Sequence, residues 1–269
     1  MPIGERMSAT VPGMREQVVV AANRWADLPE VSDRLTAARS AVDALLWRRD
    51  VRAAAAEVTA ESRARGARES AAMDGADIAA AERSPMGRVL ASAQAVTGEV
   101  PFLIETWPHA PMQVLARLHA VAAHGHQQDD SLGRPRVDRE SADDPLHLGP
   151  APDPRTAARR LALLADLVAG SSQVPALVVG GIAHAEIVSA RPFAWGSGLI
   201  GRAVVRVVMA SRGVDPSLFS VPEAGMLHLG RPTYVRALRC YEEGDVATYL
   251  VWFADAIRWG AETVQLETG

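Results

Sequence analysis

The chain has 269 residues, and 48% of them are hydrophobic, which is enough to bury one sizeable core. Its formal net charge of -4 supplies no overall positive field of the kind that attracts nucleic acid. All 28 basic residues are arginine, so no lysine is present to act as a nucleophile or to form a Schiff base.

Two further features exclude other classes of protein. The single cysteine, Cys240, leaves no partner for an internal disulfide, which is typical of a reducing compartment. The apolar run at 18–22 is too short for a membrane span or for the centre of a signal peptide. We therefore expect a cytoplasmic protein that binds neither nucleic acid nor membrane. The sequence favours no particular oligomeric state.

Helical patterns dominate the chain, because alanine is abundant and alternating β-branched residues are scarce. One predicted helix, for example, places Leu35, Ala38 and Val42 on a single face. In chain order, the predicted helices cover about 12–25, 31–47, 51–66, 86–95, 111–123, 155–168, 174–190, 198–210, 232–242 and 246–267. Pro101 and Pro108 bound an expected irregular connection. These patterns predict an all-α fold.

The longest irregular region covers residues 125–154. It contains Asp129-Asp130, Asp143-Asp144 and several prolines, a composition that is typical of a mobile surface loop. The three histidines His119, His124 and His126 lie close together in sequence just before or within it. They lack the accompanying cysteines and closely spaced carboxylates of a zinc site, so we predict no metal site.

The helices predicted at 174–190 and 198–210 are apolar on most sides, which is typical of the buried centre of a domain. The loop that joins them ends in Gly196 and Gly198, which permit a tight turn and a close approach of the backbone. The free amides at the start of the second helix, together with its dipole, favour a bound anion. This local pattern alone is compatible with a phosphate site.

The sequence of residues 191–202, RPFAWGSGLIGR, resembles the active-site loop of Fic proteins, HPFx(D/E)GNGRxxR. The matching positions are Pro192, Phe193, Gly196, Gly198 and Arg202. Other segments resemble family motifs in the same order: Leu118-His119 with Gly133 and Arg136, Ala183-His184, and Tyr234 with Leu238. The resemblance implies a Fic-like helical domain over 99–269, with a small β-hairpin flap within 125–154 that could dock a target segment.

Upstream, residues 70–75 read SAAMDG and resemble the inhibitory motif of the family, (S/T)xxx(E/D)(G/N). The resemblance implies inhibitory roles for Ser70, Asp74 and Gly75, within an N-terminal helical region over 1–98. It also implies that Asp74 pairs with Arg202 and closes the anion site. The alternative is that Asp74 only caps a helix.

The differences from the family pattern fall at the chemical positions. Arg191 stands at the position of the catalytic histidine, and a guanidinium stays protonated, so it cannot act as a general base. Trp195 replaces the acidic residue and has no oxygen ligand for Mg²⁺. Ser197 replaces an asparagine, and Leu199 replaces an arginine that would contact phosphate.

The resemblance therefore implies a nucleotide site, while the substituted positions argue against the usual reaction. In active relatives, the loop binds a nucleotide, and an AMP group is transferred to a target hydroxyl. Here Gly196, Ser197, Gly198 and Arg202 are the residues that would bind the phosphates of ATP or of another nucleotide, and the loss at Trp195 argues against Mg²⁺. We expect a degenerate Fic-fold protein without conventional AMP transfer, acting as a regulatory module that binds a nucleotide or a protein partner. The alternatives are a nucleotidyl or phosphoryl transferase that uses a non-standard catalytic residue, and a helical interaction protein with a vestigial pocket.

Overall fold

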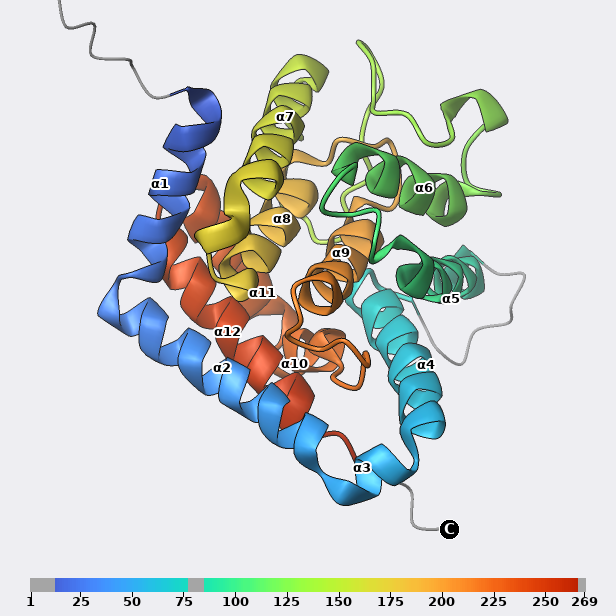
Figure 1. The fold of residues 1–269 in the computed structure, drawn as a ribbon. Helices are drawn as coiled ribbons and strands as arrows, with labels where there is room; N and C mark the ends of the chain where they lie inside the picture. Colours follow the sequence, from blue (N-terminus) through green and yellow to red (C-terminus); the bar gives the residue numbers. More distant parts are fainter. Residues whose placement is uncertain (1–12, 77–84, 266–269) are drawn as a thin grey trace, which may run out of the picture.

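The computed structural model describes residues 13–76 and 85–265, and within these ranges the chain forms helices and no β-strand, which confirms the all-α prediction (Figure 1). The elements are α1 (Met14–Ala26), α2 (Pro29–Trp47), α3 (Arg49–Ala53), α4 (Ala55–Met73), α5 (Pro85–Leu103), α6 (Pro111–Ala123), the 3-10 helix η1 (Asp129–Ser131), α7 (Pro154–Gly170), the 3-10 helix η2 (Ser171–Gln173), α8 (Ala176–Ala190), α9 (Ser197–Ser211), α10 (Pro222–His228), α11 (Arg231–Glu242) and α12 (Val246–Glu262).

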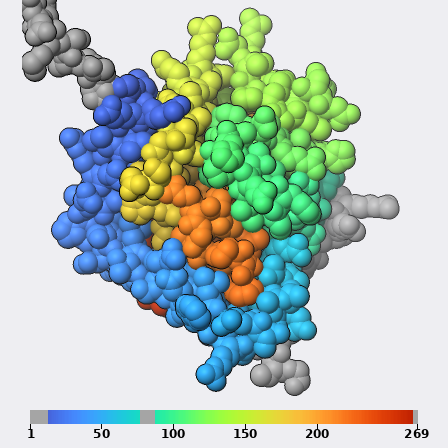
Figure 2. Space-filling model, in the orientation of Figure 1, coloured from blue at the N-terminus to red at the C-terminus, as the bar shows by residue number. Residues whose placement is uncertain are grey.

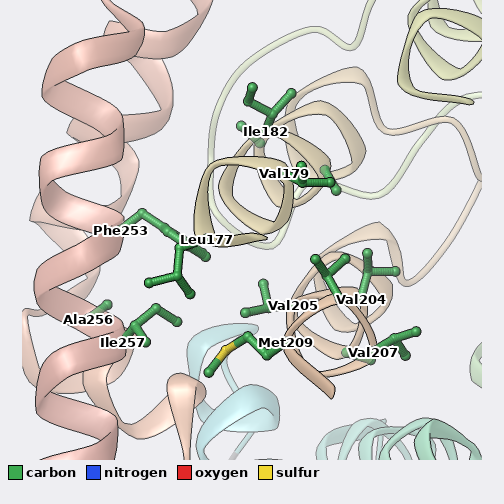
Figure 3. Packing of buried hydrophobic residues seen from close by; sticks show 14 of the residues in the cluster. Leu177, Val179, Ile182, Val204, Val205, Val207, Met209, Phe253, Ala256 and Ile257 are labelled. Carbon is green, nitrogen blue, oxygen red and sulfur yellow. The ribbon is translucent and has the colours of Figure 1, made fainter. Parts of the chain in front are cut away.

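Helices α8 and α9 form the centre of the molecule, as their apolar sequences predict. Every residue of α9 is buried except Ser211, and α8 is buried along nearly its whole length. Figure 3 shows Leu177 of α8 beside Phe253 of α12, with Val205 of α9 turned toward the same space. A Cβ at Gly201 would lie only 2.6 Å from the Val188 side chain, so this glycine lets α8 and α9 pack closely.

The N-terminal helices cover this centre. α2 lies along α12, and α1 lies beside α7 (Figure 1). In the space-filling view, the blue, yellow, green and cyan parts of the chain frame the orange segment at the end of α9 (Figure 2). One cluster of buried apolar residues runs from Ala22 in α1 to Val264 after α12. The division of the chain at residue 98 stays a prediction, and α5 passes through that position.

The region 125–154 differs from its expected form. No β-hairpin forms there: the segment contains η1 and an isolated bridge between His124 and Gln127. Two backbone amides of the segment instead donate to the loop between α8 and α9: that of Arg136 to the carbonyl of Pro192 at 2.7 Å, and that of Asp143 to the carbonyl of Ala194 at 3.0 Å. The segment is therefore fastened to the loop by hydrogen bonds.

Three smaller features concern individual helices. Pro101 does not begin an irregular connection, because α5 continues through it to Leu103. The short helix α10 was not predicted from the sequence. None of the helices in the described part of the chain is both long enough and apolar enough to cross a membrane.

Candidate functional site

The loop between α8 and α9 has left-handed backbone at both ends. Arg191, at the end of α8, has a φ of 41°, and Gly196, immediately before α9, has a φ of 79°. Glycine adopts this conformation without steric cost, whereas Arg191 must be held in it by its surroundings. The loop therefore turns sharply and presents its amides at the N-terminus of α9.

Arg202 is fully buried one turn into α9 and is held by α4. Its Nε donates to the hydroxyl of Ser70 at 2.7 Å, and its Nη2 donates to the carbonyl of Ser70 at 3.0 Å. The same Nη2 lies 2.7 Å from the carboxylate of Asp74. Burial alone would lower the pKa of Arg202, but Asp74 and Tyr234 raise it, so the guanidinium keeps its charge. The structure thus brings Ser70, Asp74 and Arg202 together.

Two glycines make the approach of Asp74 possible. Gly75 has a φ of 85° and lies just past the end of α4, where a left-handed residue is a common helix terminator. A Cβ on Gly198 would lie 2.9 Å from both carboxylate oxygens of Asp74. Gly75 and Gly198 therefore place the Asp74 carboxylate against the first turn of α9.

A second buried arginine fixes α4 to α9 in the same manner. Arg206 donates to the hydroxyl and to the carbonyl of Ser62, each at 3.0 Å, and its Nε lies 2.7 Å from the Glu223 carboxylate. Sequence reasoning did not identify this set. The sequence indicates this contact only by its spacing: Arg206 follows Arg202 by one helical turn, and Ser62 precedes Ser70 by eight residues.

Arg191 is 4% exposed, and its guanidinium faces the segment 143–149. Its Nη1 lies 3.1 Å from the carboxylate of Asp144, and its Nη2 donates to the carbonyl of Gly149 at 2.6 Å. The carbonyl of Arg191 accepts from Nε of Arg136 at 2.7 Å. These contacts hold the left-handed backbone at Arg191 and give its charge a partner within the chain.

The amide of Gly196, which the sequence analysis assigned to an anion, is occupied by an acidic side chain. It donates to the carboxylate of Asp143 at 3.1 Å, and the amide of Asp143 donates in turn to the carbonyl of Ala194 at 3.0 Å. Burial raises the pKa of Asp143 to about 7; the hydrogen bond from Gly196 opposes this rise, and the nearby charge of Asp74 adds to it. A carboxyl group thus lies where a phosphate oxygen was expected.

The other substituted positions pack within the protein. Trp195 stacks on His126 with ring centroids 3.8 Å apart. Leu199 joins a small apolar cluster with Ala67 and Ala71 of α4. The hydroxyl of Ser197 is buried and has no hydrogen-bond partner in the protein.

The remaining motif histidines, His119 and His184, are both buried. His119 stacks on Phe193, and its Nδ1 accepts from the amide of Gly133 at 3.0 Å. His184 lies within hydrogen-bond distance of the hydroxyls of Tyr234 and Tyr249, at 2.8 and 2.6 Å. Burial lowers the pKa of His119 to about 4 and that of His184 to about 3, so both rings are neutral at pH 7.

Donors for a phosphate are present, but space for it is not. The hydroxyl of Ser197 and Nη1 of Arg202 are both buried without partners. The cavity beside Ser197, Gly198 and Asp143 measures only about 10 Å³, which is about one water molecule. A nucleotide phosphate fits only after Asp74 and Asp143 move. Among the described residues, no group of three or more His, Cys, Asp or Glu side chains could hold a metal ion.

Sequence reasoning missed Asp143 and Asp144. Both lie about 50 residues before the loop that they contact, in a segment whose composition resembles that of solvated loops. The signal that was available is a pair of acidic residues in a fold whose site carries Arg191 and Arg202.

No protein-family model matches the chain, and no curated protein matches it. Solved structures do. A Fic family protein from Desulfovibrio desulfuricans G20 is 17% identical, with a TM-score of 0.69 over 87% of this chain and 73% of that chain. Fic-1 from C. elegans is 14% identical, with a TM-score of 0.65 over 92% of this chain and 73% of that chain. At these identities the likeness concerns the fold, and the chain has the fold of Fic proteins.

Proposed function

We propose that this chain is a Fic-fold protein that does not carry out conventional AMP transfer and acts as a regulatory module whose nucleotide site is closed by its own side chains. The observation that carries the proposal is the contact of Arg202 with Ser70 and Asp74. It uses the cation that would bind phosphate, and it places a carboxylate beside the amides of α9. A nucleotide gains Arg202 only when Asp74 leaves it.

The substituted residues support the absence of AMP transfer. Arg191 offers no lone pair that could accept a proton, and its charge is paired with Asp144. Trp195 offers no oxygen ligand and packs on His126. General acid–base catalysis contributes roughly 10²–10⁴ in rate, so its loss at this position removes a large part of the expected activity.

Calorimetry tests the binding part of this proposal. A non-hydrolysable ATP analogue is titrated, with and without Mg²⁺, into the intact chain, into Asp74→Gly and into Asp43→Asn. Asp43 pairs with Arg39 on the surface of α2 and serves as the matched control. Of these three proteins, we expect only Asp74→Gly to show new or tighter binding of the analogue. Because a glycine there could disturb the end of α4, Asp74→Asn is measured as well, and circular dichroism establishes that each variant is folded.

The absence of binding in every folded variant, and also in a folded double variant Asp74→Asn/Asp143→Ala that removes both carboxylates from the site, would reject the nucleotide module. The helical interaction protein with a vestigial pocket would then be the better proposal, and its ligand would be a protein partner.

One observation favours a transferase as the second candidate. Asp143 contacts the loop at Gly196 and has a pKa raised to about 7 by burial, which suits a general base at neutral pH. Incubation with ATP labelled at the α-phosphate separates the two candidates. The regulatory module predicts no label on the protein. The transferase predicts label in Asp74→Asn that disappears when Asp143→Asn is added, because the base is then gone.

A further inference from the structure

Residues 143–149, which we call the strap, contact Arg191, where the loop begins, and Gly196, which immediately precedes α9. The strap is attached at three kinds of contact. Asp143 binds the backbone of Ala194 and Gly196, as described above. Asp144 and Gly149 bind the guanidinium of Arg191. Leu146 is 4% exposed and belongs to the apolar core.

The strap has its own internal order. The two carboxylate oxygens of Asp144 accept from the amides of Leu148 and Gly149 at 2.8 and 2.9 Å. Arg231 of α11 donates to the carbonyl of Pro145. Asp144 therefore shapes the turn and binds Arg191 with the same side chain, so that the strap forms a defined structure over the loop.

The charges around Asp143 are unbalanced. Its carboxyl group faces Asp74 from α4, Arg191 from the loop and Asp144 from the strap itself. Asp74 is paired with Arg202 and Asp144 with Arg191, whereas Asp143 contacts only the neutral Gly196 amide. A charge on Asp143 is therefore poorly solvated. Asp74 and Asp144 repel it, Arg191 and the Gly196 amide attract it, and the loss of solvation is the largest of these effects. The closed strap accommodates the neutral form better.

We propose that the strap is a second closure of the nucleotide site, separate from the Asp74–Arg202 pair, and that a negative charge on Asp143 releases it. The inference rests on the proposed function in that the site it closes is the proposed nucleotide site. In the open strap, the Asp143 carboxyl group is solvated and titrates near the ordinary value for aspartate, about 3.9.

The direction of the pH effect follows from linkage. The closed strap holds the proton of Asp143 up to a higher pH than the open strap does, so opening becomes more favourable as pH rises. The opening constant grows about tenfold per pH unit between the two pKa values, and it is constant above the higher one. The strap is tightest in acid and loosest from neutral pH upward.

Hydrogen exchange of the intact chain, without nucleotide, tests this inference. The amides followed are those of Asp143, Leu148, Gly149 and Gly196, each hydrogen-bonded at the strap. After correction for the intrinsic exchange rate, we expect their protection to fall about tenfold per pH unit from pH 5 to 7 and to level off above pH 7. The amide of Val221, which donates to the carbonyl of Gly260 and not to the strap, is the internal control.

Two isosteric variants make the test specific. Asp143→Asn still accepts from Gly196 but cannot ionise, so its strap protection should not depend on pH. Asp74→Asn removes one repelling charge, so protection should level off at a lower pH. Protection that is independent of pH in the unmodified chain, or that changes equally in Asp143→Asn, overturns the inference. These outcomes are independent of the nucleotide titration, so failure of the strap and failure of the proposed function are distinguishable.

Discussion

The Arg202 side chain is a fully buried cation, and one carboxylate, that of Asp74, balances its charge. A buried ion pair of this kind adds little net stability compared with an apolar pair of the same shape, because both charges lose their hydration. Removal of one partner is costly, however, since the other charge then stays buried without compensation. The pair therefore fixes where the end of α4 lies more than it stabilises the fold.

We expect Asp74→Asn to lower the free energy of unfolding by about 3 kcal/mol, because Arg202 remains buried without a counter-ion. Asp43→Asn, which removes an exposed partner of Arg39, should change it by less than about 1 kcal/mol. Urea denaturation at pH 7 measures both. Equal effects of the two substitutions would mean that Arg202 has access to water or to another acceptor.

Asp143 should make the stability of the whole protein depend on pH. Its pKa in the folded protein, about 7, lies above the ordinary value for aspartate. The neutral Asp143 carboxyl therefore contributes its full share to the free energy of unfolding below about pH 4, and this contribution is lost as pH rises to about 7. A pKa shift of this size corresponds to a change of at most about 4 kcal/mol in the free energy of unfolding. His119 and His184 act in the opposite sense, because their folded pKa values are lowered and they destabilise the fold as pH falls below their ordinary value.

The difference between the unmodified chain and Asp143→Asn isolates the contribution of Asp143, because both contain the same histidines. We expect Asp143→Asn to gain stability relative to the unmodified chain as pH rises from 5 to 7, by up to about 1.4 kcal/mol per pH unit. Denaturant curves at several pH values measure this difference. Parallel pH profiles for the two proteins would show that the Asp143 carboxyl is not buried in solution.

At the scale of elements, the packing of α4 on α9 determines the site. Ser62 and Ser70 each offer a hydroxyl and a carbonyl to one arginine of α9, and Gly66 lies between them on α4. A Cβ at Gly66 would collide with Nη2 of Arg206. The close approach of the two helices, and hence the position of Asp74 at the end of α4, requires a residue without a side chain there.

Gly66→Ala should therefore destabilise the protein, although alanine is the better helix former by about 1 kcal/mol. Gly98→Ala is the matched control, since Gly98 lies in α5 with nothing within 4 Å of the added Cβ. We expect the control to raise the free energy of unfolding by about 0.5–1 kcal/mol and Gly66→Ala to lower it. A stabilising effect at both positions would falsify the tight packing of α4 on α9.

The elements show which parts of the structure the sequence could predict. Helices α8 and α9 follow from their apolar composition, and the prediction of 174–190 agrees closely with Ala176–Ala190. The pair of Asp74 with Arg202 was predicted from motif resemblance and not from periodicity, whereas the hydrogen bonds of Arg202 to Ser70 were not predicted. The strap could not be predicted, because it depends on hydrogen bonds between segments about 50 residues apart that leave no local pattern.

At the scale of the whole molecule, the buried apolar residues of the N-terminal and C-terminal helices form one cluster. Leu45 near the end of α2 is 2% exposed, and α2 packs along α12, which in turn contacts α8. The helices that hold the candidate site therefore share a core with helices that contribute no residue to it. This connection predicts that a cavity in α2 weakens the structure around the loop.

Leu45→Ala should lower the free energy of unfolding by about 2–5 kcal/mol, the usual range for a fully buried leucine. If the core unfolds as one unit, amide exchange of the slowest sites in α9 should accelerate by the same free energy, although α9 lies away from α2. Val20→Ala in α1, where Val20 is 42% exposed, is the control and should change neither quantity by more than about 0.5 kcal/mol. Faster exchange confined to α1 and α2 would instead show that the N-terminal helices open separately, and the candidate site would then tolerate their loss.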